Sequence, residues 1–194
     1  MNACCSRTSL IAASVVFGTL IGAAICSPHA FAAPITTSFA LSGAVDRPAQ
    51  FGLADLQSLP AQTEAVSFLT GQGPVSARFT GPSLWSVISS AGLTAVPGAK
   101  NSDLRNVVVA TGSDGYAVAY SGGELDPRFG GSAAVPALVA YLQNGAPLGA
   151  DGFARTTAPR DAAGGRYVTN VASINVVQAP NNPGQGGGAS GSLT

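Results

Sequence analysis

Residues 64–92 read EAVSFLTGQGPVSARFTGPSLWSVISSAG, and this pattern predicts a hairpin that runs directly into a helix. Two segments with strand-like patterns, residues 64–70 and 74–80, flank Gly71-Gln72-Gly73, which is typical of a hairpin turn. In the second segment apolar and polar side chains alternate, so we expect one face of that strand to be buried.

The helix expected next spans residues 84–92. Pro82 and Ser83 are typical of a helix start, and Gly92 is typical of a helix end. Trp85, the only tryptophan, lies on the first turn, and we interpret it as a core residue rather than a ligand platform. The apolar side chains recur at helical spacing on one face, which consists of Leu84, Val87, Ile88 and Ala91.

Further short elements are expected on both sides of this unit. A helix is expected at residues 53–59, where Pro60 ends it. Three segments have strand-like patterns, and these are residues 106–111, 115–120 and 168–177. The first is continuously apolar, which predicts a central strand, whereas residues 137–142 fit either a helix or a strand. Because strands outnumber helices, the expected fold class is α+β: a β-rich mixed sheet or barrel-like domain with short helices.

The composition excludes several classes of protein. Of 194 residues, 46% are hydrophobic and 9% are charged, against about 25% charged in an average soluble domain. The formal net charge is zero, which argues against a nucleic-acid-binding protein, because such proteins need a basic face. The sequence contains a single long apolar run, at its start, so we do not expect a polytopic membrane protein.

The first 32 residues have the pattern of a cleaved signal peptide. A short polar region precedes an apolar stretch at residues 10–25, and Ala30-Phe31-Ala32 matches a small-residue cleavage site. An uncleaved N-terminal anchor is the alternative. We therefore expect a secreted or periplasmic protein with one domain at residues 33–178. A tail rich in glycine, proline and asparagine, residues 179–194, is expected to be disordered.

The cysteines and the histidine all fall in the predicted signal peptide, at Cys4, Cys5, Cys26 and His29. The mature chain would therefore have no disulfide, no thiolate nucleophile, no imidazole base and no Cys/His zinc site. Ser132 lies in a Gly-rich stretch, but without a histidine partner it does not favour hydrolase chemistry. We assign no catalytic and no metal-ligating residue, and whether the protein is an enzyme stays open at this point.

Five short motifs occur in order along the chain: FTGPSLW (79–85), SDGY (113–116), AYLQNGAPL (140–148), GFARTTAP (152–159) and GRYV (165–168). No single motif is specific, but together they resemble the molybdopterin-binding domain of the sulfite oxidase family, over about residues 51–177. The resemblance implies a compact mixed α/β domain with a central pterin-binding cleft. The activity it implies is that of a molybdopterin-dependent oxidoreductase.

The sequence departs from the family at the metal ligand. In the family, a cysteine on the strand before the first motif ligates molybdenum, but the corresponding strand here, residues 66–70, contains none. Thr70 or Gly71 occupies about that position, and a hydroxyl does not replace a thiolate as a soft ligand. The resemblance therefore suggests molybdopterin as the cofactor but does not favour its thiolate-bound metal form.

The residues predicted to bind a pterin-like or anionic ligand are Thr70, Gly71, Asp114, Tyr116 and Arg155. The first choice is Arg155, because a guanidinium offers a two-pronged fork to a phosphate, sulfate or carboxylate. The alternative is an arginine that simply pairs with Asp151 or Asp161.

The other candidates also have a structural alternative. Asp114-Gly115-Tyr116 either lines the cleft or forms a tight turn that leads into a strand, and the turn is the interpretation we favour. The segment Thr70–Gly73 is either a backbone-lined anion loop or a plain hairpin turn. Arg78, on the polar face of the next strand, either adds positive charge or is a solvated edge residue.

These observations lead to one main functional hypothesis and two alternatives. The main hypothesis is an exported, degenerate member of the family that binds a small anionic or pterin-like ligand. The alternatives are an active molybdopterin oxidoreductase and a non-catalytic envelope interaction or scaffold domain. The expected partners are a small anionic ligand or a pterin, and a redox or envelope protein, without nucleic acid and without stable membrane insertion after cleavage.

Overall fold

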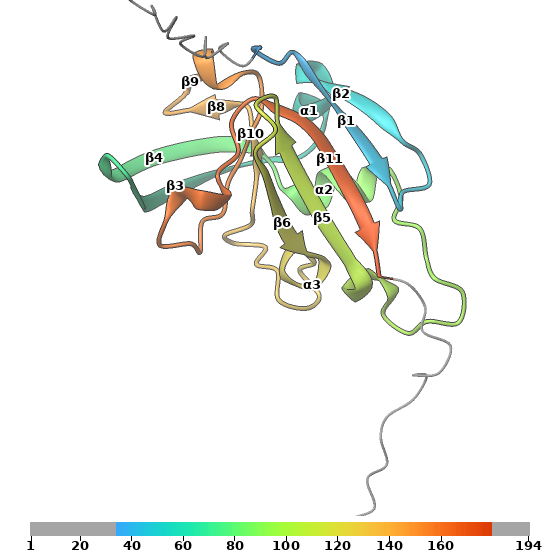
Figure 1. Ribbon diagram of the computed structural model, residues 1–194. Helices are drawn as coiled ribbons and strands as arrows, with labels where there is room; N and C mark the ends of the chain where they lie inside the picture. Colours follow the sequence, from blue (N-terminus) through green and yellow to red (C-terminus); the bar gives the residue numbers. More distant parts are fainter. Residues whose placement is uncertain (1–33, 180–194) are drawn as a thin grey trace, which may run out of the picture. The chain divides into compact units, whose positions relative to one another are not determined.

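The computed structural model describes residues 34–179. The predicted signal peptide, residues 1–32, and residues 180–194 of the predicted tail lie outside the described residues. Two sheets and a two-stranded ribbon form the domain, with short helices between them (Figure 1). Within residues 34–179, none of the helices has the length and apolar character needed to cross a membrane.

The larger sheet has five strands in the order β2-β1-β11-β5-β6. Its strands are β1 (Ser38–Gly43), β2 (Ala49–Gly52), β5 (Asn106–Gly112), β6 (Ala117–Ser121) and β11 (Val171–Gln178). β1 and β11 run parallel, with Ala40 opposite Ser173, whereas the other neighbours are antiparallel. The first and last described strands therefore lie side by side in this sheet.

The smaller sheet has four strands in the order β3-β4-β8-β9 and contains the predicted hairpin. Its strands are β3 (Ala61–Thr70), β4 (Gly73–Pro82), β8 (Leu142–Gln143) and β9 (Ala146–Pro147). The separate ribbon consists of β7 (Val139–Ala140) and β10 (Arg155–Thr156). The hairpin is confirmed and is longer than predicted, and it extends to one side of the larger sheet (Figure 1).

The helices are short and have clear start signals. They are α1 (Leu53–Ser58), α2 (Leu84–Ser90) and α3 (Gly122–Leu125), with 3₁₀ turns η1 (Ser102–Arg105), η2 (Gly149–Asp151) and η3 (Gly164–Arg166). The Ser86 N–H donates to the Ser83 hydroxyl over 3.0 Å, which caps α2 as predicted. Gly92 has a φ of +73°, a left-handed conformation that glycine adopts freely, and the chain leaves the helix there.

The predicted apolar face of α2 is the centre of the core. Leu84, Val87 and Ile88 are completely buried and belong to the same cluster as Phe39 of β1 and Ile174 of β11. Burial of such side chains is worth about 1.5–3 kcal/mol each, so this short helix is held by packing rather than by its own propensity.

One expectation needs correction, and the structure makes two others more specific. β5 is an interior strand, as predicted, but only one of its faces is buried, because the outer face of the sheet is uncovered and leaves Val107 38% exposed. The closing strand begins at Val171 rather than residue 168, because Asn170 adopts a left-handed φ of 48° that interrupts extended backbone. Residues 137–142, which fitted a helix or a strand, contribute to the strands β7 and β8.

Candidate ligand-binding site

A cavity of about 310 Å³ lies between the start of α2, the β6–α3 junction and two loops, residues 126–137 and 158–166. We call it the arginine cavity, because two arginines contribute to its wall. Its polar and charged lining side chains are Gln62, Ser83, Ser86, Tyr120, Glu124, Ser132, Arg160 and Arg166. Its apolar lining includes Trp85, Leu125, Val135 and several prolines and alanines.

The start of α2 supplies one wall. The hydroxyls of Ser83 and Ser86 lie 2.7 Å apart and hydrogen-bond to each other. Trp85 is only partly buried: it packs against the core and also lines the cavity, so the interpretation as a core residue alone was incomplete. The strand-to-helix turn thus places a flat apolar ring beside two hydroxyls.

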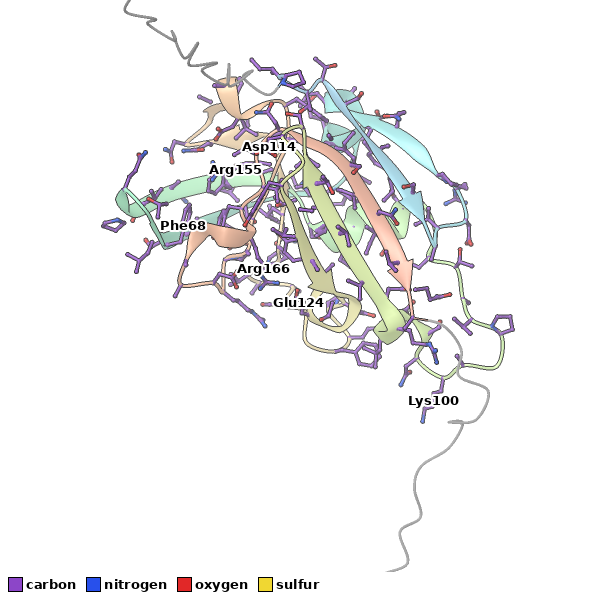
Figure 2. The ribbon with its side chains drawn as sticks, viewed as in Figure 1. Phe68, Lys100, Asp114, Glu124, Arg155 and Arg166 are labelled. Carbon is purple, nitrogen blue, oxygen red and sulfur yellow. The ribbon has the colours of Figure 1, made fainter. Side chains whose placement is uncertain are left out.

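Arg166 forms another part of the wall and is held by two carboxylates. Its guanidinium donates to both carboxylate oxygens of Asp161, each over 2.7 Å, and to Glu124 over 2.7 Å. These bonds keep the pKa of the Asp161 carboxyl below its usual range. Figure 2 shows Arg166 and Glu124 together near α3. The charge of Arg166 is therefore balanced by carboxylates, and its orientation is fixed.

Glu124 has a second role, because it also completes the start of α3. Its carboxylate accepts the Ser121 N–H over 3.1 Å, and its own N–H donates to the Ser121 hydroxyl over 3.2 Å. This reciprocal capping box fixes the carboxylate that holds Arg166. The local sequence Ser121-Gly-Gly-Glu124 therefore positions one wall of the cavity.

Arg160 is a second cation in the wall, and among residues 34–179 no acid compensates its charge. Its guanidinium donates to the Gly130 carbonyl over 3.0 Å, and no carboxylate in residues 34–179 forms an ion pair with it. It is exposed at the loop that closes one side of the cavity. An exposed, unpaired guanidinium of this kind suits a two-pronged contact with an anion.

Arg155, the first predicted binding residue, pairs with Asp151 over 2.7 Å, which is the alternative that the sequence left open. Its guanidinium lies over the rings of Phe79 and Tyr167, 5.2 Å and 5.8 Å from their centroids. Its side chain is 15% exposed and does not line the arginine cavity. A role in ligand binding stays a prediction for this residue.

Asp114 and Tyr116 form the predicted tight turn. The Tyr116 N–H donates to the Asp114 carboxylate over 2.9 Å, and Gly115 has a φ of +82°. The Tyr116 hydroxyl donates to the Gly165 carbonyl over 2.6 Å. Backbone hydrogen bonds connect this turn with Asp151, the partner of Arg155. The Ser113 N–H donates to the Asn170 carbonyl, and the Asn170 N–H donates to the Asp151 carbonyl. The structure therefore brings these three predicted residues into one region, outside the arginine cavity.

Thr70 and Gly71 lie at the exposed turn of the β3–β4 hairpin. The Thr70 hydroxyl donates to the Gly73 carbonyl over 2.8 Å and accepts the Gln72 N–H over 3.2 Å, so it is engaged within its own turn. Neither residue lines the arginine cavity. The structure does not bring the five predicted residues together around one cavity.

The donor set does not fit molybdenum held by a protein thiolate. The position predicted for the ligand carries an exposed hydroxyl, and residues 34–179 contain no cysteine. The same residues contain no cluster of three His, Cys, Asp or Glu side chains that would hold a metal ion. Soft thiolate ligands select such metals, and hydroxyls do not supply equivalent donors.

No family model and no curated protein matches the sequence. Among solved structures, the crystal structure of the sulfane dehydrogenase SoxCD from Paracoccus pantotrophus matches with a TM-score of 0.59 and 16% identity. The domain shares this fold. The resemblance to the sulfite oxidase family is thus confirmed at the level of fold.

The match covers only part of each chain. It covers 76% of this chain and 40% of the matched chain, so this chain spans less than half the length of that protein. At this identity the match shows the fold alone, and function depends on the site.

Sequence reasoning missed Arg160 and Arg166 as site residues. Both occur in stretches that also contain aspartate or glycine, and an isolated arginine in such a stretch is usually a solvated residue. Arg166 was noticed only as part of the GRYV motif. The available signal was the Ser121-Gly-Gly-Glu124 capping box, but nothing in the sequence indicates that Glu124 meets Arg166.

Proposed function

We propose that this domain is a binding module that holds a small anionic ligand in the arginine cavity, without thiolate-bound molybdenum. The observation that carries the proposal is Arg160: a guanidinium at the cavity wall that no carboxylate in residues 34–179 compensates. Arg166, although neutralised, presents fixed N–H groups nearby, and the hydroxyls of Ser83 and Ser86 add donors. An anion of a few heavy atoms, alone or on a flat organic body against Trp85, suits this lining.

The sulfite-oxidase-type fold supports the proposal and guides the choice of probes. The matched protein is named a sulfane dehydrogenase, so sulfur oxyanions are reasonable test ligands for this domain. Pterin-6-carboxylate tests the pterin-like alternative, because it combines a flat heterocycle with one negative charge. Phosphate serves as a general anion of different chemistry.

The experiment is isothermal titration calorimetry of the domain with sulfite, thiosulfate, phosphate and pterin-6-carboxylate. We expect at least one probe to bind. Arg160→Gln should lower the affinity for that probe by about tenfold, equivalent to about 1.4 kcal/mol. Arg47→Gln is the matched control, because Arg47 is also exposed and also donates to a single backbone carbonyl, that of Ser90. The proposal fails if no probe binds at millimolar concentration, or if Arg160→Gln binds as tightly as the Arg47→Gln control.

A further inference from the structure

The strand β3 is the edge of the smaller sheet, and most of its outer side is open. It is ten residues long and, within residues 34–179, pairs along its length with β4 alone. Near its end, Leu69 forms an isolated parallel bridge with Ala163 of the loop that follows β10. This loop covers only the last part of the edge, so the rest lacks a neighbouring strand among the described residues.

The direction of the backbone groups along this edge follows from Leu69. Its N–H donates to the Ala162 carbonyl over 2.9 Å, away from β4, and the residue opposite is Pro74, which has no N–H. Because backbone groups alternate along a strand, those of residues 63, 65 and 67 point the same way.

Side-chain contacts agree with this assignment. The hydroxyls of Thr63 and Thr80 lie 2.8 Å apart, and those of Ser67 and Ser76 lie 2.7 Å apart. Such close side chains are typical of antiparallel pairs that do not exchange backbone hydrogen bonds. On β4, the backbone groups of Arg78 bond outward to Asn144, as the same alternation requires.

Thr63, Ala65 and Ser67 therefore present unused backbone donors and acceptors. All three residues are exposed, and no backbone hydrogen bond within residues 34–179 reaches them from the outer side. An unpaired row of this kind is a template for another extended chain. The bridge at Leu69 shows that the edge already accepts extended backbone at one end.

Glu64 indicates which chain would fit. It is the only charged residue of β3 and is 9% exposed on the inner face, and its carboxylate has no hydrogen bond or ion pair with any described residue. Burial raises the pKa of its carboxyl, in keeping with a carboxylate that lacks a partner. An inward-pointing charge at an edge opposes pairing with an apolar strand. It also opposes symmetric pairing of two copies, which would bring two such carboxylates close together.

We propose that the β3 edge docks an extended segment of a partner protein that carries a lysine or arginine opposite Glu64. Backbone bonds to Thr63, Ala65 and Ser67 would hold the segment, and the basic side chain would neutralise Glu64. The inference does not depend on the ligand of the arginine cavity.

The probes are two fluorescein-labelled peptides, acetyl-STVTKTVTS-amide and acetyl-STVTETVTS-amide, titrated with the domain and followed by fluorescence polarisation. We expect the lysine peptide to bind about tenfold more tightly than the glutamate peptide, and Glu64→Gln to remove this difference. Hydrogen exchange should show slower exchange of the amides of residues 63, 65 and 67 in the complex. Asp55→Asn, which removes a carboxylate of α1, should leave both affinities unchanged.

A backbone variant tests the geometry separately. Ala65→Pro removes one outward N–H without removing a bond to β4, so the fold should survive while both peptides lose binding. If Ala65→Pro does not fold, the Glu64→Gln comparison and the exchange pattern still decide. Equal binding of the two peptides, no binding of either, protection of other amides, or dimerisation of the domain through this edge would each overturn the proposal.

Discussion

Arg166 contacts Tyr120 twice: its guanidinium lies 5.1 Å from the centre of the Tyr120 ring, and its carbonyl accepts the Tyr120 hydroxyl over 2.6 Å. The hydroxyl also reaches Thr156 over 3.2 Å. Burial raises the pKa of Tyr120 to about 12, so the phenol stays protonated and donates at neutral pH. One aromatic side chain thus fixes both the backbone and the charge of a cavity arginine.

Removing the Tyr120 hydroxyl should therefore lower stability. Tyr120→Phe leaves the ring beneath Arg166 but removes the hydrogen bond to its carbonyl, and we expect the free energy of unfolding to fall by about 1 kcal/mol. Urea denaturation measures the change. Tyr141→Phe is the control, because the Tyr141 hydroxyl has no hydrogen bond within the described residues; an equal loss in both variants would contradict the assignment.

The pair of Arg166 and Asp161 predicts a specific response to acid. The pKa of Asp161 is lowered in the folded state, so the folded protein resists protonating this carboxylate. Its contribution is complete above about pH 4, the ordinary value for aspartate, and is lost as the pH falls further. Asp161→Asn should cost about 1 kcal/mol at pH 7, because the pair is partly exposed, and should flatten the decline of stability below pH 4. Chemical denaturation at several pH values measures both effects.

Gly81 predicts a large effect from one methyl group. A Cβ at this position would overlap the carbonyl oxygen of Val139, where β4 and β7 approach closely. Because this oxygen belongs to the backbone, it cannot move aside as a flexible side chain could. Gly81→Ala should therefore lower the free energy of unfolding by about 3 kcal/mol or more. Gly71→Ala is the matched control, because nothing lies within 4 Å of its Cβ position. Thermal melts that shift equally would contradict this interpretation.

Replacing Glu64 by glutamine should raise the free energy of unfolding at neutral pH. Its carboxyl pKa is raised by burial, so ionisation is less favourable in the folded than in the unfolded chain, and stability is lost as the pH rises through the folded pKa. Glu64→Gln removes this cost, and we expect a gain of about 1 kcal/mol at pH 7 that vanishes below about pH 4. Unchanged or lower stability at pH 7 would contradict the prediction.

The sequence was informative where contacts are local. The hairpin and α2 were predicted because the turn, the cap at Ser83 and the helical spacing of apolar residues all lie within residues 64–92. The turn at Asp114 was predicted for the same reason. The continuous apolar run of residues 106–111 predicted an interior strand, which β5 is, but such a run does not reveal whether both faces of a sheet are covered.

The site depends on contacts between distant parts of the chain. Tyr120 and Arg166 are separated by 46 positions, and Glu124 and Arg166 by 42. Their meeting depends on how α3 and the loop before β11 pack, which periodicity does not encode. Arg155 was predicted from its motif, but an ion pair with Asp151, four positions away, neutralises its charge.

The parallel pairing of β1 with β11 has a consequence for how the molecule assembles. The larger sheet is complete only when β11 lies between β1 and β5. The pairing of β1 with β11 therefore joins the two ends of the described chain. Closing so large a loop costs entropy before any contact repays it, and folds of this kind are slow. During synthesis, β1 can pair early with β2, but its other edge must wait until nearly the whole domain has left the ribosome, and this edge stays open to chaperones until then.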